Sequence, residues 1–118
     1  MIAKLMGLPT ISPAELQKRL GSVEVFDVNA HGSWFDKRVP GAKHLDPAAF
    51  EASDLPADRS ATLVFYCSGP LCRKAPNAAK RARQLGYASV IVLSAGISGW
   101  ISASMPTESG DDTMVRLD

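Results

Sequence analysis

A chain of 118 residues, 46% apolar and 21% charged, is long enough to fold around a hydrophobic core without disulfides or metals. Its formal net charge of +1 gives no reason to expect nucleic acid or a membrane surface as a partner. Because it has no long apolar span, no secretory signal and only two cysteines, the sequence predicts a cytoplasmic protein with a single domain over residues 1–118.

The first part of the chain alternates strand and helix signals. A strand is expected over residues 8–11, and the helix that follows has Ser12 as its N-cap and Glu15 at the capping-box position. Residues 23–28, VEVFDV, predict a second strand with Asp27 near its carboxyl end.

The middle of the chain leads to its most apolar strand. Residues 31–38 predict a short helix or turn, residues 42–45 an edge strand and residues 46–53 another short helix. Residues 62–66, TLVFY, are typical of a central parallel strand that is buried on both faces.

The last part continues the alternation. Residues 74–85 predict a helix, because small and apolar side chains recur on one face with the helical period: Ala75, Ala78, Ala79, Ala82 and Leu85. A strand over 88–93 and a short helix over 96–102 complete a core of residues 8–106, and residues 107–118 are expected to be a mobile tail. This order of elements predicts parallel βαβ units and an α/β sandwich.

Cys67 stands directly after the central strand, where reactive groups of open α/β sheets lie. The next helix begins a few residues later, and the start of a helix stabilises an anion, so this position favours a nucleophilic thiolate. A cysteine here is also a common apolar filler, but filler does not need a cation six positions on, at Arg73. We therefore interpret Cys67 as a nucleophile.

The loop after Cys67 is the candidate site for an anion. Its residues are Ser68, Gly69, Pro70, Leu71, Cys72 and Arg73. Pro70 has no N–H, so at most five backbone donors remain, and Gly69 best tolerates unusual backbone angles. Arg73 is expected to attract an anionic substrate, because a cation at the start of a helix is otherwise unfavourable.

Cys72 allows two interpretations. It is either a resolving thiol that reacts with Cys67 or a small loop residue whose side chain is turned away. The two cysteines with His31 and His44 match no common zinc spacing, so neither a metal nor an organic cofactor is predicted.

Two stretches of the chain read FDVNAHGSWFDKRVPGAKHLDP and LVFYCSGPLCRKAPNAAKRARQLGYASVIVLSAGISGW. Together they resemble the rhodanese (sulfurtransferase) family over about residues 11–106. The resemblance implies a three-layer sandwich with a central parallel five-stranded sheet between helices. It also implies that Cys67 takes sulfane sulfur from thiosulfate or another small donor as a persulfide. A thiol, cyanide or a protein cysteine would then accept that sulfur.

The sequence departs from the family pattern at several positions. Asn29 replaces an arginine that commonly pairs with Asp27, which leaves Asp27 a structural role. Arg38 replaces a histidine and either lends positive potential near the loop or lies solvated on the surface. Cys67 and Arg73 span seven positions, as in relatives that act on phosphate or arsenate. A phosphatase or arsenate reductase therefore stays an alternative, as does a non-catalytic regulatory module.

Overall fold

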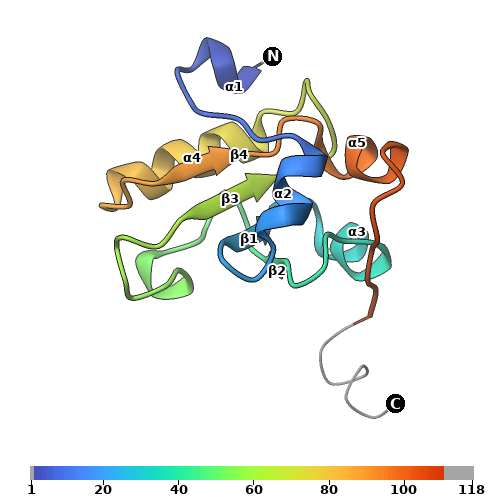
Figure 1. Ribbon diagram of the computed structural model, residues 1–118. Helices are drawn as coiled ribbons and strands as arrows, with labels where there is room; N and C mark the ends of the chain where they lie inside the picture. Colours follow the sequence, from blue (N-terminus) through green and yellow to red (C-terminus); the bar gives the residue numbers. More distant parts are fainter. Residues whose placement is uncertain (1, 111–118) are drawn as a thin grey trace.

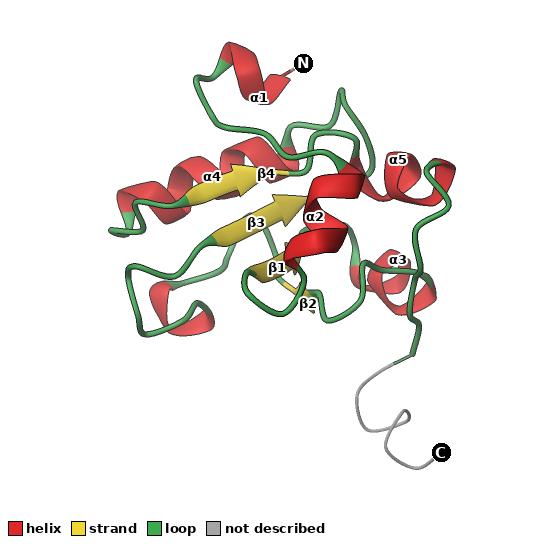
Figure 2. Cartoon of the chain, in the orientation of Figure 1, coloured by secondary structure: helices red, strands yellow, loops and turns green. Residues whose placement is uncertain are grey.

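The computed structural model describes residues 2–110 and has a parallel sheet with the strand order β2-β1-β3-β4 (Figure 1). The strands are β1 (Glu24–Asp27), β2 (Lys43–His44), β3 (Leu63–Tyr66) and β4 (Val90–Val92). The helices are α1 (Ile2–Leu5), α2 (Pro13–Arg19), α3 (His31–Asp36), the 3-10 helix η1 (Ala52–Asp54), α4 (Lys74–Gln84) and α5 (Gly96–Ser102). Helices connect the parallel strands, as Figure 2 shows, and the predicted α/β fold is confirmed.

Within residues 2–110 the sheet has four strands, so the prediction of five is wrong by one. Of residues 8–11, Thr10 pairs with Val92 of β4 in an isolated parallel bridge, in which the Pro9 carbonyl accepts a 2.9 Å hydrogen bond from Val92 N. Pro9 has no N–H to donate, and Ser12 already forms the cap of α2. Pairing at this edge therefore cannot extend into a strand.

The short helix predicted over residues 46–53 does not form either. The Asp46 carboxylate accepts a 2.9 Å hydrogen bond from Ala48 N, and the Asp46 carbonyl accepts hydrogen bonds from Ala49 N and Phe50 N, so the chain makes one turn over residues 46–50 that does not continue as a helix. The chain then buries Phe50 in the core, and the 3-10 helix η1 follows.

The other predicted elements are confirmed, with small differences at their ends. α2 begins with the expected capping box, in which Ser12 and Glu15 each accept a 3.2 Å hydrogen bond from the other's backbone N–H. α1 lies outside the predicted elements, and its Ala3 is buried against the same core as α4. None of the helices within residues 2–110 is both long and apolar enough to cross a bilayer.

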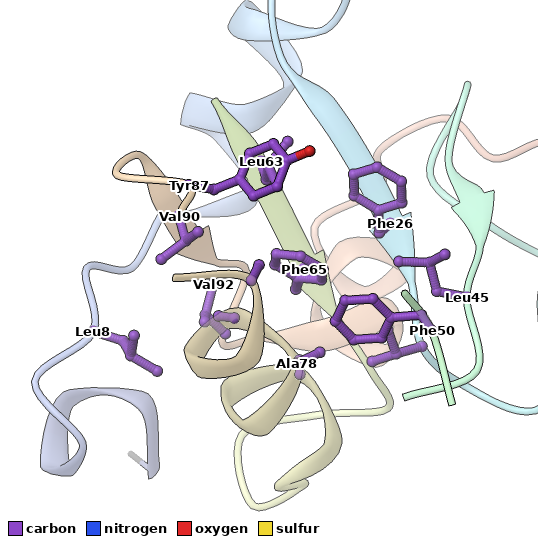
Figure 3. Packing of buried hydrophobic residues seen from close by; sticks show 14 of the residues in the cluster. Leu8, Phe26, Leu45, Phe50, Leu63, Phe65, Ala78, Tyr87, Val90 and Val92 are labelled. Carbon is purple, nitrogen blue, oxygen red and sulfur yellow. The ribbon is translucent and has the colours of Figure 1, made fainter. Parts of the chain in front are cut away.

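The sheet buries both of its faces, and the alternation along β3 decides which face each side chain meets. Leu63 and Phe65 pack with the alanine face of α4, and Figure 3 shows Phe65 among its aromatic and aliphatic neighbours. Val64 and Tyr66 pack on the opposite face. That second core also holds Leu16 of α2 and the fully buried Trp100 of α5.

The segment after α5 is fixed to the body of the protein at least as far as Gly110. Glu108 and Arg38 exchange two backbone hydrogen bonds of 3.0 and 3.1 Å, and Gly110 N donates to Phe35 O at 2.8 Å. The predicted mobile tail of residues 107–118 is therefore wrong for its first part, and its remainder lies outside the described residues.

Candidate functional site

Cys67 follows β3 directly and lies on the α4 face of the sheet, because it is two residues beyond Phe65. It is only 2% exposed. Ala75 N, in the first turn of α4, donates a 3.4 Å hydrogen bond to Cys67 Sγ. The sulfur thus lies at the amino end of an 11-residue helix, where the helix dipole and a free N–H stabilise negative charge.

Cys67 forms a disulfide with Cys72, and the two Cα atoms are 6.4 Å apart. The loop between them turns back on itself through a 3.2 Å hydrogen bond from Cys72 N to Gly69 O. The interpretation in which the Cys72 side chain is turned away is therefore wrong. Cys67 is buried and Cys72 is partly exposed, so solvent reaches this bond from the Cys72 side.

The start of α5 binds the backbone at Cys67 and Ser68, where the loop begins. Ile97 N donates to Cys67 O at 2.9 Å, and Ser98 N donates to Ser68 O at 3.1 Å. This close approach requires glycine at position 96, where φ is +65° and a Cβ atom would lie 2.5 Å from the Ser68 carbonyl carbon. The AGISGW stretch therefore supports the loop through its backbone.

These contacts also set the direction of the loop amides. The peptide bonds are trans and planar, so each N–H points opposite to the carbonyl of the same peptide unit. Since the carbonyls of Cys67 and Ser68 point at α5, the N–H groups of Ser68 and Gly69 point to the other side of the loop. An anion on that side would meet two backbone donors.

In this oxidised state the expected ring of donors from residues 68–73 is not assembled on the sulfur. Within the described chain, Ala75 is the residue that donates to Cys67 Sγ, while the Cys72 amide bonds to Gly69 O. A disulfide sulfur carries no charge and needs no converging donors.

Arg73 occupies the N-cap position of α4 with an exposed side chain, and no carboxylate within residues 2–110 pairs with it. Together with Cys72 and Lys74 it lines an open groove of about 480 Å³. The neighbouring loop residues Ser68 and Pro70 are exposed, and Leu71 is 82% exposed. Two cations thus flank the accessible side of the disulfide.

Asp27 and Tyr66 form a buried network on the face opposite to Cys67. Asp27 accepts hydrogen bonds of 2.8 Å from Asn29 N and 2.7 Å from the Tyr66 hydroxyl, which in turn accepts one of 3.1 Å from Val39 N. Burial raises the pKa of Asp27, and burial together with the nearby Asp27 charge raises the pKa of Tyr66. Asp27 therefore does not line the pocket at Cys67, and its hydrogen bond with Tyr66 joins β1 to β3.

Arg38 is 1% exposed, so the interpretation that it is solvated is wrong. Its guanidinium lies 4.1 Å from the Trp34 ring centroid and forms a 3.1 Å ion pair with Glu108. The remaining guanidinium donor, Nη2, is buried and has no partner within the described residues. Arg38 anchors the segment after α5 and does not line the small pocket beside Cys67.

The structure also brings residues to the site that sequence reasoning missed. Ala3 of α1 and Ser94 line the small pocket beside Cys67, although nothing in their sequence context indicates it. His31 and His44 lie together with ring centroids 5.3 Å apart, next to a cavity of about 400 Å³ that Lys74 also lines. Among residues 2–110 no group of three or more histidine, cysteine or acidic side chains is arranged to hold a metal ion.

Known proteins with similar sequences include members of one domain family and two curated relatives. The family model described as "Rhodanese-like domain" matches residues 12–103. An HTH-type transcriptional regulator from Mycobacterium tuberculosis is 34% identical over 114 residues, which cover 92% of this chain and 49% of the regulator. An uncharacterized protein from Synechocystis is 28% identical over 100 residues, covering 83% of this chain and 55% of the relative. The chain thus spans about half the length of these curated relatives.

Solved structures share the fold. A protein from Bacillus halodurans superposes with a TM-score of 0.78 at 20% identity, covering 98% of this chain and 93% of that one. A thiosulfate sulfurtransferase from Pseudomonas aeruginosa gives a TM-score of 0.75 at 27% identity over 89% of this chain and 20% of that one. A human single-domain sulfurtransferase gives 0.68 at 24% identity over 81% of this chain and 97% of that one.

Proposed function

The chain belongs to the rhodanese-like domain family, and we propose that it is a sulfurtransferase of this family. It would move sulfane sulfur from thiosulfate or another small donor to a thiophilic acceptor such as a thiol, cyanide or a protein cysteine. The observation that carries the proposal is the position of Cys67, which directly follows β3 with its sulfur hydrogen-bonded to the first turn of α4. A cytoplasmic location is part of the proposal, since the reaction needs Cys67 as a free thiolate.

The chemistry proceeds in two steps. In the reduced protein the Cys67 thiolate attacks the outer sulfur of thiosulfate, the S–S bond of the donor breaks, and sulfite leaves with the bonding electron pair. The persulfide on Cys67 then gives its outer sulfur to the acceptor and restores the thiolate. Both states of Cys67 are anionic, so the same donors serve both steps.

The surroundings of Cys67 support this chemistry. The N–H groups of Ser68 and Gly69 point away from α5, to the side on which an anion would find them free. Arg73 and Lys74 are exposed beside the loop and add positive charge for a dianionic donor. The family's known sulfurtransferases make sulfur transfer the first candidate, with the residues above in these roles.

A second candidate, a non-catalytic regulatory module, is favoured by the similarity to a transcriptional regulator of about twice the chain's length. In that case the loop would hold sulfur or a disulfide without turnover. A phosphatase or arsenate reductase is the third candidate, because Cys67 and Arg73 span seven positions. Pro70 removes one amide donor, and Asp27, on the far face of the sheet, offers no acid to a leaving group.

A single-turnover experiment separates the candidates. Protein is reduced with a thiol, desalted, and mixed with thiosulfate, and sulfite is measured. We expect about one sulfite per chain from the wild type and none from Cys67→Ser, while Lys80→Ala on the exposed face of α4 matches the wild type. With cyanide present, the transferred sulfur should appear as thiocyanate. Hydrolysis of an aryl phosphate without sulfite release would instead support a phosphatase, and neither reaction would support a regulatory module.

A further inference from the structure

The disulfide places the sulfur of Cys72 in contact with Cys67, the residue proposed to carry the persulfide. Cys72 reaches Cys67 across a loop that the Cys72 N to Gly69 O hydrogen bond holds closed, with the Cα atoms 6.4 Å apart. This spacing lies within the ordinary range for a disulfide, so the backbone need not move for the two sulfurs to react. A persulfide formed on Cys67 would therefore have a thiol of the same chain within reach.

We propose that Cys72 discharges the Cys67 persulfide, releasing its outer sulfur as hydrosulfide, and that the acceptor class of this protein is a dithiol that reopens the disulfide. The inference rests on the proposed sulfurtransferase function. Cys72 is then a reacting residue in the step that follows the formation of the Cys67 persulfide.

The step balances without a further reagent. The Cys72 thiolate attacks Cys67 Sγ, a bond forms between the two cysteine sulfurs, and the bond from Cys67 Sγ to the outer sulfur breaks. The outer sulfur takes up the proton that the Cys72 thiol loses and leaves with the electron pair as HS⁻. Thiosulfate and two cysteine thiols thus become sulfite, hydrogen sulfide and the disulfide, so the two thiols are oxidised and the sulfane sulfur is reduced. A dithiol must then reduce the disulfide for a second turnover.

Burial decides which sulfur the reductant attacks. Cys67 is 2% exposed, whereas Cys72 is partly exposed and lines the open groove beside Arg73 and Lys74. An incoming thiolate therefore meets Cys72 Sγ and expels Cys67 as the leaving thiolate. The Ala75 N–H and the start of α4 stabilise that leaving group, which speeds its departure.

The same direction of attack explains the preference for a dithiol. A reductant that attacks Cys72 becomes bonded to it as a mixed disulfide. A second thiol on the same reductant acts at a high effective concentration and frees Cys72, whereas a monothiol needs a second molecule. The product is the Cys67 thiolate, already hydrogen-bonded to Ala75 and ready for the next donor.

The test follows sulfite and sulfide together under anaerobic conditions. Reduced, desalted wild type given thiosulfate should release sulfide and sulfite in about equal amounts and end about 2 Da lighter, as the disulfide. Cys72→Ser should release sulfite but at least about 10-fold less sulfide, and should hold a mass increase of about 32 Da. Cys67→Ser should release neither. Dithiothreitol added to the oxidised wild type should reopen the disulfide and permit a second, equal release of sulfide and sulfite when thiosulfate is supplied again.

The outcomes separate this inference from the proposed function. Sulfite release with a persulfide that is equally long-lived in wild type and Cys72→Ser would overturn the role of Cys72 and leave sulfur transfer standing. No sulfite from the wild type would overturn both. Cys72→Ala serves as a second variant. The equal release of sulfide and sulfite is measured on the wild type itself, so the test does not depend on whether one variant folds correctly.

Discussion

The Tyr66 hydroxyl donates a 2.7 Å hydrogen bond to the Asp27 carboxylate and so joins the carboxyl ends of β3 and β1. The two residues are paired in register, and their side chains lie on the face of the sheet opposite to Cys67. The same hydroxyl accepts a hydrogen bond from Val39 N. This network takes the place of the salt bridge that the family pattern leads one to expect, because Asn29 stands where an arginine is common.

Tyr66→Phe tests the network directly. The substitution leaves the buried Asp27 carboxylate with one donor fewer and Val39 N without its acceptor, at a cost of about 1–3 kcal/mol in the free energy of unfolding. Urea denaturation followed by circular dichroism measures the loss. Sulfite release per folded chain should stay unchanged, because the network lies on the other face of the sheet. A variant as stable as the wild type would show that the network contributes nothing.

Asp27→Asn isolates the pH dependence of the buried carboxyl. Burial raises the pKa of Asp27 above its ordinary value of 3.8, so the unfolded chain loses this proton at a lower pH than the folded protein does. The contribution of Asp27 to stability is thus present below pH 3.8 and is lost as the pH rises through the folded-state pKa.

We therefore expect the free energy of unfolding of Asp27→Asn, relative to the wild type, to increase between about pH 4 and pH 7. Urea midpoints and slopes of both proteins, measured in parallel across this range, give the difference. The comparison cancels the carboxylates whose pKa is lowered, such as Glu15 and Asp58, because both proteins contain them. A difference that does not change with pH would contradict the prediction.

Gly96→Ala probes the support of the loop by α5. The positive φ of +65° and the short distance from a Cβ atom to Ser68 both oppose alanine, so we expect a loss of about 1–3 kcal/mol and a slower sulfite burst. Gly32→Ala is the matched control, since Gly32 lies in α3 with open space around it and should be neutral or slightly stabilising. If the two variants had equal stability and equal sulfite bursts, the backbone contact of Gly96 with Ser68 would not support the loop.

Arg73→Ala tests the electrostatic role of the loop cation. Its exposed guanidinium has no carboxylate partner within residues 2–110, so its charge is free to act on a dianionic donor. We expect the KM for thiosulfate to rise about 10-fold at low ionic strength and the difference from the wild type to shrink as salt increases. Arg83→Ala, in the last turn of the same helix, is the control. An unchanged KM for Arg73→Ala would assign Arg73 to the helix surface.

Much of this protein could be predicted because the deciding interactions are local. The Ser12–Glu15 capping box specifies where α2 begins, and the alanine face of α4 follows from its helical period. The apolar run before Cys67 predicts a buried strand, and a cysteine after such a strand must lie at the carboxyl edge of a parallel sheet. Each inference needs residues that are close in sequence and a general rule of chain geometry.

Contacts between segments that are distant in sequence decided the features that local sequence did not predict. Arg38 is buried because Glu108, 70 residues later, pairs with it. The direction of the Cys72 side chain likewise depends on how the loop folds between α4 and α5. Local sequence constrains backbone conformation, whereas pairing across the fold depends on which segments the packed sheet brings together.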